Sequence, residues 1–198
     1  MSAGRADIPY VDFATIRLPS GPLAARGLPP CRAVGRPRGL VVDATAGLGG
    51  DAFLLAVAGF EVLAVERHPE VFEALAAGLE RAEADPKLSR WLGGRLRLRL
   101  ADARDVLEEL VDVSAVHVDP MFPEKRKTAL PPKDIQQLRR LVGADEDAVE
   151  LYRASTRYHF QDRQRYDQYL GLLALEAHLF RVPARAFEVQ PFYVSTVF

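Results

Sequence analysis

The stretch VVDATAGLGGDAF holds the residues best suited to chemistry, because an acid and a threonine precede a run of glycines. Gly47, Gly49 and Gly50 allow positive φ angles and let a ligand approach the backbone closely. The helix that we expect next presents N–H groups without partners in its first turn, around Asp51, and such groups favour an anionic or carboxylate-bearing ligand. The sequence therefore predicts a polar ligand held between this loop and the helix.

Two classes of ligand compete for the glycine loop. The spacing of Gly47, Gly49 and Ala52 fits the pattern G-x-G-x-x-A of nicotinamide-dependent enzymes. Asp43, however, disfavours a pyrophosphate at this place and suits an ammonium group, such as that of S-adenosylmethionine. The pattern Asp43-x-Thr45-x-Gly47-x-Gly49 resembles the first motif of class I methyltransferases. We therefore expect S-adenosylmethionine as the cofactor and keep a nicotinamide-dependent oxidoreductase as the minor alternative.

Strands and helices alternate along the part of the chain that must position these residues. Apolar segments predict strands at residues 39–43, 60–67, 95–100 and 114–120, and helices at 51–59, 69–85 and 102–110. Such alternation is typical of an α/β fold with a doubly wound, mostly parallel sheet, which is a Rossmann-like architecture. Segment 95–100, RLRLRL, predicts a half-exposed strand with its leucines on one face. Further segments predict helices at 133–142, 145–155 and 166–180, a fifth strand at 156–160 and a β-rich tail at 185–198.

Acidic side chains follow three of the predicted strands. Glu66 and Arg67 end the second strand, Asp102 and Ala103 follow the third, and Asp119 follows the fourth. The carboxyl ends of parallel strands meet at one crevice, where an acid after the second strand accepts hydrogen bonds from ribose hydroxyls. Each acid taken singly is equally well explained as a helix cap or a surface residue. Their placement at successive strand ends favours a shared ligand site.

Composition excludes several classes of protein. The formal net charge of −1 gives no global field for nucleic acid or membrane, so that any such partner must meet a local patch. The single cysteine, Cys31, excludes an internal disulfide, and the four histidines lack the close spacing of metal ligands. No apolar run approaches the roughly 20 residues of a membrane helix, and the N-terminus lacks the apolar core of a signal peptide. We expect a cytoplasmic protein without metal.

The 198 residues, 48% of them hydrophobic, are enough for one well-filled core. Residues 1–38 are rich in arginine, proline and glycine, which predicts a basic, irregular N-terminal lead-in. Residues 39–198 then form the ligand-binding domain.

The segment DPMFP, which ends the fourth predicted strand, resembles the Asp/Asn-Pro-Pro-Tyr/Phe motif of methyltransferases that act on exocyclic amines of bases. Asp119 and the Pro120 carbonyl are suited to accept the two N–H bonds of such an amine, and Phe122 to stack on the base. Three cations that suit RNA phosphates follow: Lys125, Arg126 and Lys127. An ordinary Asp-Pro turn and a solvated charge run are the alternatives.

Four segments together resemble the ribosomal RNA small subunit methyltransferase J family: VVDATAGLGGDAFLLA, VERHPEVFEALAAGLERA, VHVDPMFPEKRKTAL and LVGADEDAVEL. The resemblance extends from about residue 39 to about residue 151. It implies a class I methyltransferase that makes N2-methylguanosine in 16S ribosomal RNA, with small-subunit RNA or the assembled small subunit as partner. It implies as cofactor contacts Gly50, Asp51, Glu66, Arg67, Asp102, Ala103 and Asp119. The N-terminal region is shorter than in that family, and TRYHFQDRQ makes the C-terminal part divergent.

We therefore expect methyl transfer from S-adenosylmethionine to the exocyclic N2 of a guanine in small-subunit ribosomal RNA, with Asp119 and Phe122 as catalytic residues. One alternative is a different acceptor, such as a DNA adenine or a protein amide, because the same amine geometry serves all of them. The other is a truncated, non-catalytic relative that binds cofactor or RNA, which the short, divergent flanks suggest.

Overall fold

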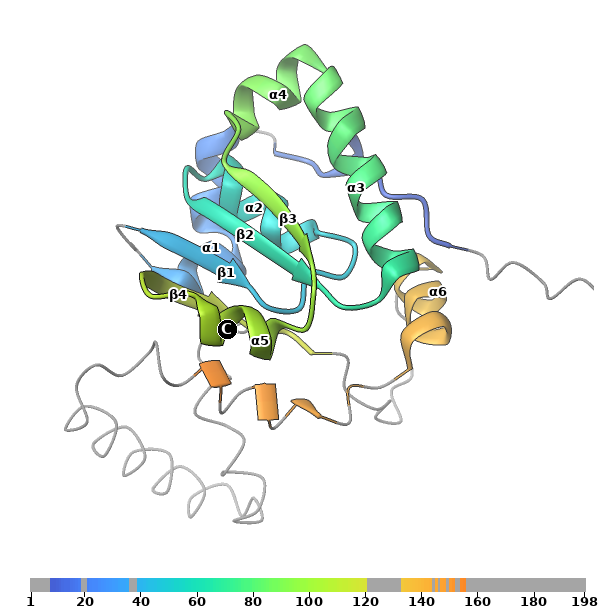
Figure 1. The fold of residues 1–198 in the computed structure, drawn as a ribbon. Helices are drawn as coiled ribbons and strands as arrows, with labels where there is room; N and C mark the ends of the chain where they lie inside the picture. The colour runs from blue at the N-terminus through green and yellow to red at the C-terminus, as the bar shows by residue number, and fades with distance from the viewer. Residues whose placement is uncertain are drawn as a thin grey trace, which may run out of the picture.

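The computed structural model describes residues 8–18, 21–35, 39–120, 133–143, 145, 147, 148, 150, 151, 154 and 155. Its centre is a four-stranded sheet in the order β3-β2-β1-β4, in which every pair of neighbours is parallel (Figure 1). The strands are β1 (Leu40–Asp43), β2 (Glu61–Glu66), β3 (Leu96–Leu100) and β4 (Val113–His117). The predicted doubly wound α/β fold is confirmed.

The strand register brings the carboxyl ends of the strands to one edge of the sheet. Asp43 pairs with Ala64 on β2 and with His117 on β4, and Glu66 pairs with Leu100 on β3. The loops that follow these residues therefore start side by side, as expected at the carboxyl edge of a parallel sheet.

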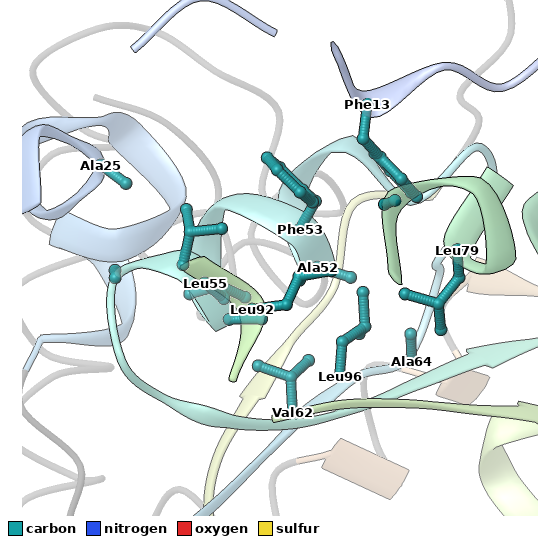
Figure 2. Packing of buried hydrophobic residues seen from close by; sticks show 14 of the residues in the cluster. Phe13, Ala25, Ala52, Phe53, Leu55, Val62, Ala64, Leu79, Leu92 and Leu96 are labelled. Atoms are coloured by element: carbon teal, nitrogen blue, oxygen red, sulfur yellow. The ribbon is translucent and has the colours of Figure 1, made fainter. Parts of the chain in front are cut away.

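Helices cover both faces of the sheet (Figure 1). The helices are α1 (Pro29–Val34), α2 (Gly50–Val57), α3 (Pro69–Ala84), α4 (Pro86–Leu92), α5 (Ala103–Glu109) and α6 (Lys133–Val142). Val41 and Val62 face a core shared with α1 to α4 (Figure 2), whereas Val42 and Val65 face a second core with α5. Consecutive residues of one strand thus enter opposite cores, because side chains alternate across a sheet.

The lead-in contributes to the first core. It contains two short 3-10 helices, η1 (Phe13–Thr15) and η2 (Pro22–Gly27), and α1. The Phe13 ring stacks on Phe53 of α2 with centroids 4.8 Å apart. Regular structure therefore occupies much of a segment for which we expected an irregular chain. The boundary between residues 38 and 39 stays a prediction.

Strand β3 follows the predicted alternation only in its first half. Leu96 is buried and Arg97 exposed, but the Leu100 side chain is 46% exposed. Leu100 lies at the last position of a strand at the edge of the sheet, and it belongs to neither of the two cores. The short helix α4 was not predicted.

Several predictions concern residues outside the described part of the chain. These are the fifth strand at 156–160, the helix at 166–180, the β-rich tail, and the site residues Phe122, Lys125, Arg126 and Lys127. In the part that the structure describes, no helix is long and apolar enough to span a membrane. Among the same residues, no group of three or more histidine, cysteine or acidic side chains is arranged to hold a metal ion.

Candidate functional site

A cavity of about 540 Å³ opens at the carboxyl ends of the strands. This volume lies within the roughly 300–1,000 Å³ typical of small-molecule sites. The loop after β1 and the residues after β2, β3 and β4 form its floor, and the segment from Tyr10 to Ile16 and helix α6 form two of its walls. The sheet edge predicted from the sequence is therefore a concave site.

The glycine loop adopts a backbone that requires glycine. Gly47 and Gly49 have φ angles of 51° and 76°, in the left-handed region that L-residues rarely adopt. A Cβ atom on Gly49 would lie 2.3 Å from Leu75 Cδ1 and 3.2 Å from the Phe13 ring, whereas a Cβ on Gly50 would meet nothing within 4 Å. Gly49 thus lets the loop pack on α3, and Gly50 leaves open space at the start of α2.

Glu66 shapes the glycine loop from the end of β2. Its Oε2 accepts the Gly47 N–H at 2.9 Å, and its Oε1 accepts the His68 N–H at 2.8 Å. The residue is only 7% exposed, and it lines the cavity. Because each carboxylate oxygen has two lone pairs, Glu66 keeps acceptor capacity for ligand hydroxyls.

A cluster of ionisable groups lies between β1, β4 and the start of α2. The His117 ring Nε2 is 3.0 Å from Asp51 Oδ2, and both Asp43 and His117 are 1% exposed. Burial raises the pKa of Asp43 to about 6; Asp51 and Asp119 add to the rise, and His117 opposes it. Burial alone would lower the pKa of His117, but the Asp51 hydrogen bond and the surrounding carboxylates raise it to about 9.

Thr45 connects the glycine loop to the segment after β4. Its N–H donates to Asp43 Oδ1 at 3.2 Å, and its hydroxyl oxygen accepts the Asp119 N–H at 2.7 Å. Desolvation by the surrounding chain, together with the charge of Asp51, raises the pKa of Asp119. The Asp119 backbone is thereby fixed beside the loop.

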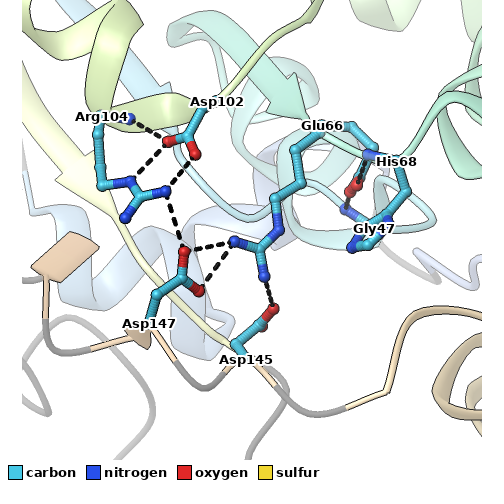
Figure 3. A network of polar contacts seen from close by, with 8 residues as sticks. Gly47, Glu66, His68, Asp102, Arg104, Asp145 and Asp147 are labelled. Atoms are coloured by element: carbon cyan, nitrogen blue, oxygen red, sulfur yellow. Dashed lines mark hydrogen bonds and ion pairs between the residues drawn. The ribbon is translucent and has the colours of Figure 1, made fainter.

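An ionic network closes another side of the cavity (Figure 3). Arg67 donates from Nη1 to both carboxylate oxygens of Asp147 at 2.8 Å and from Nη2 to Asp145 at 2.5 Å. Arg104 pairs with Asp102 at 2.6 Å and reaches Asp147 at 3.0 Å. These pairs tie the segment after α6 to the ends of β2 and β3, and the hydrogen bonds from Arg67 lower the pKa of Asp147.

We expect Asp147→Asn to weaken cofactor binding severalfold, because its ion pairs close one side of the cavity. The free energy of unfolding should fall by at most about 1 kcal/mol, because those ion pairs are partly exposed. Calorimetric titration at low and high salt measures the first effect, which should shrink at high salt. Glu109→Gln is the matched control, since it breaks the Arg99–Glu109 pair outside the cavity. Equal losses of affinity in the two variants would contradict this role.

The structure brings most of the predicted site residues together. Those that line the cavity are Asp43, Thr45, Gly47, Gly50, Asp51, Glu66, Arg67, Asp102, Ala103 and Asp119. Gly49 lies in the same loop but packs on Leu75 and Phe13 instead. Asp102 also accepts the Arg104 N–H at 2.9 Å, so that the helix-cap alternative holds for it as well.

Three parts of the site were not predicted from the sequence: His117, the wall at residues 10–16, and the acids Asp145 and Asp147. The signal for His117 was present, since it is a basic residue inside an apolar strand two positions before Asp119. The wall is held by Arg81, which donates to the Val11 carbonyl at 2.6 Å and lies 4.4 Å from the centre of the Tyr10 ring.

Comparisons with known proteins show the family of the chain. Residues 10–163 match the model of a family described as "Putative SAM-dependent methyltransferase". Curated relatives bear the name Ribosomal RNA small subunit methyltransferase J, and three of them illustrate the similarity. The protein from Photobacterium profundum is 43% identical over 136 residues, which are 64% of this chain and 53% of the relative. Those from Rhodopseudomonas palustris and Shewanella denitrificans are 47% and 39% identical, over 67% and 76% of this chain and 58% and 65% of the relatives. The chain thus spans about half to two thirds of the length of these relatives.

Proposed function

The chain belongs to the family of SAM-dependent methyltransferases whose model it matches, and from this premise we propose that it methylates the exocyclic N2 of a guanine in small-subunit ribosomal RNA. The names of its curated relatives support ribosomal RNA of the small subunit as the substrate. The DPMFP motif supports an exocyclic amine as the acceptor. The resemblance to the methyltransferase J family supports N2 of guanine as the methylated position. A cytoplasmic location accompanies this proposal as a prediction.

The observation that carries the proposal is the buried carboxylate of Asp43 beside a glycine loop in a cavity of about 540 Å³. S-adenosylmethionine supplies a methyl group that its sulfonium already activates. Its ammonium group fits Asp43, and its ribose hydroxyls fit the remaining acceptor capacity of Glu66. Asp51, Asp102, Ala103 and the loop glycines line the same cavity and are the other proposed contacts. The donors and acceptors present therefore suit this cofactor.

The protein's task toward the acceptor is positioning. A guanine amino group is a poor nucleophile because its lone pair is delocalised into the ring. Asp119 and the Pro120 carbonyl accept its two N–H bonds, which turns the lone pair toward the methyl group. The hydrogen bond from the Asp119 N–H to Thr45 holds this acceptor beside the cofactor loop. Phe122 stacks on the base, and Lys125, Arg126 and Lys127 bind RNA phosphates in this proposal.

We expect S-adenosylmethionine and S-adenosylhomocysteine to bind the purified chain with micromolar dissociation constants in calorimetric titrations. Asp43→Asn should weaken both at least tenfold, because the buried partner of the ammonium group loses its charge. No binding by the unmodified chain would contradict the proposed cofactor site.

Transfer of labelled methyl groups should be tested on 16S ribosomal RNA, assembled small subunits, DNA and protein. Digestion of the labelled RNA should yield N2-methylguanosine. Label in DNA adenine or in protein would overturn the acceptor. Tight cofactor binding without transfer to any of these would favour the non-catalytic alternative, which the divergent segment TRYHFQDRQ motivates.

A further inference from the structure

His117 is a buried basic residue among carboxylates. It lies at the end of β4, 1% exposed, with Nε2 3.0 Å from Asp51 Oδ2. Asp43 is its register partner on β1, so that the two side chains leave the same face of strands spaced about 4.8 Å apart. Asp119, two residues further along the chain, lines the same cavity. Three elements therefore direct carboxylates at one imidazole.

The charge of His117 follows from this arrangement. Carboxylates held close together repel one another, and burying them without a counter-charge is costly. In the part of the chain that the structure describes, no arginine or lysine pairs with Asp43 or Asp51, and Nδ1 of His117 finds no hydrogen-bond partner. The Cys31 thiol on α1 adds no further negative charge, because burial and Asp51 raise its pKa to about 12. The protonated imidazole of His117 is therefore the group that compensates the negative charge of these carboxylates.

We propose that His117 is positively charged in the folded protein and acts as a positioning residue that keeps the Asp43 and Asp119 carboxylates ionised. In that form Asp43 binds the ammonium group of the cofactor, and Asp119 accepts stronger hydrogen bonds from the acceptor amine than a neutral side chain would. The identity of these ligands rests on the proposed function, but the charge of His117 does not.

The proposed effect of His117 on ligand affinity depends on pH. With a pKa of about 6, Asp43 is ionised at neutral pH and takes up a proton as the pH falls through 6. Because His117 lowers the pKa of Asp43, removing the imidazole raises that pKa further. His117 itself loses its proton as the pH rises through about 9. Above that pH, the unmodified protein and a variant without the imidazole both lack a positive charge at this position.

The test compares His117→Gln with the unmodified chain by titration with S-adenosylhomocysteine between pH 6 and pH 9.5. Glutamine keeps an N–H that can donate to Asp51 but carries no charge. The ratio of the two dissociation constants cancels the ligand's own titration. We expect this ratio at pH 6 to be about 5 if the Asp43 pKa rises by one unit and about 50 if it rises by two. The ratio should approach 1 near pH 9.5. A ratio that does not change with pH would overturn the inference in favour of a purely structural His117.

A double-mutant cycle locates the effect at Asp43. In an Asp43→Asn background, adding His117→Gln should leave the dissociation constant with little dependence on pH beyond that of Asp43→Asn alone. The same rise toward low pH in both backgrounds would show that His117 does not act through Asp43.

Nuclear magnetic resonance tests the charge without a ligand. The chain has four histidines, and the His117 imidazole nitrogens are identified by the signals that disappear in His117→Gln. We expect their shifts to be those of an imidazolium at pH 8. A neutral imidazole at pH 7 would overturn the inference even if the cofactor binds. Conversely, an imidazolium in a chain that binds no cofactor would leave the charge established and refute the proposed function alone.

Discussion

Asp119→Ala is expected to lower the rate of methyl transfer by about 100-fold or more, while the dissociation constant of S-adenosylmethionine changes by no more than a few fold. The carboxylate is the group proposed to orient the acceptor amine, and a misplaced reacting group costs on the order of 100-fold in rate. The proposed partners of the ammonium and ribose groups, Asp43 and Glu66, are elsewhere in the cavity. The backbone bond from Asp119 to Thr45 does not involve the side chain and remains in the variant.

Asp119→Asn is the matched control, because its amide oxygen still accepts a hydrogen bond and its size is unchanged. We expect it to stay within about tenfold of the unmodified chain, in keeping with a motif that admits either residue. Single-turnover transfer at saturating cofactor separates these effects from binding. Turnover by the alanine variant at the normal rate would remove Asp119 from its assigned role.

Gly49→Ala should lower the free energy of unfolding by about 2–5 kcal/mol. The residue has a φ of 76°, which costs an L-residue about 1–2 kcal/mol. Its new Cβ would also lie 2.3 Å from Leu75 Cδ1, and overpacking of this kind costs about 1–3 kcal/mol. Leu75 is fully buried, so that it has little room to retreat. Urea unfolding followed by circular dichroism measures the change.

Gly50→Ala is the control one residue away. Gly50 begins α2 with an ordinary backbone, and an added Cβ would meet nothing within 4 Å. Alanine there should leave stability unchanged or raise it by up to about 1 kcal/mol, because it is a better helix former. A loss of affinity without a loss of stability would support Gly50 as a cofactor contact. If both alanine variants were equally stable, the steric account of the loop would be wrong.

The sheet could be predicted because its strands are short apolar runs separated by clear helical patterns. The resemblance to ribosomal RNA small subunit methyltransferase J is likewise confirmed by the family model and the relatives. Helix α4 was missed, although Asp85 caps it by accepting the Lys87 and Leu88 N–H groups and Pro86 occupies its first position. The lead-in was predicted to be irregular because it is rich in proline and arginine. A few apolar residues among them nevertheless pack into the first core.

The acids of the site could be predicted from strand ends, since strand topology alone brings those ends together. Their partners could not, because these depend on how distant segments pack. His117 meets Asp51 across 66 residues of chain, and Arg67 meets Asp147 across 80. No local pattern encodes such pairs. The chemical roles of the strand-end residues stay predictions until the proposed variants are measured.

The wall at residues 10–16 has a consequence for the order in which the protein matures. Val11 is anchored by Arg81, which lies 70 residues later, and it packs over Gly78 of α3. During synthesis this segment therefore leaves the ribosome well before its docking surface exists. Contacts between such distant residues form late, because a long loop must close first. The wall at residues 10–16 can consequently dock only after α3 has formed, and the cavity is complete only once helix α6, which follows later in the chain, has also packed against it.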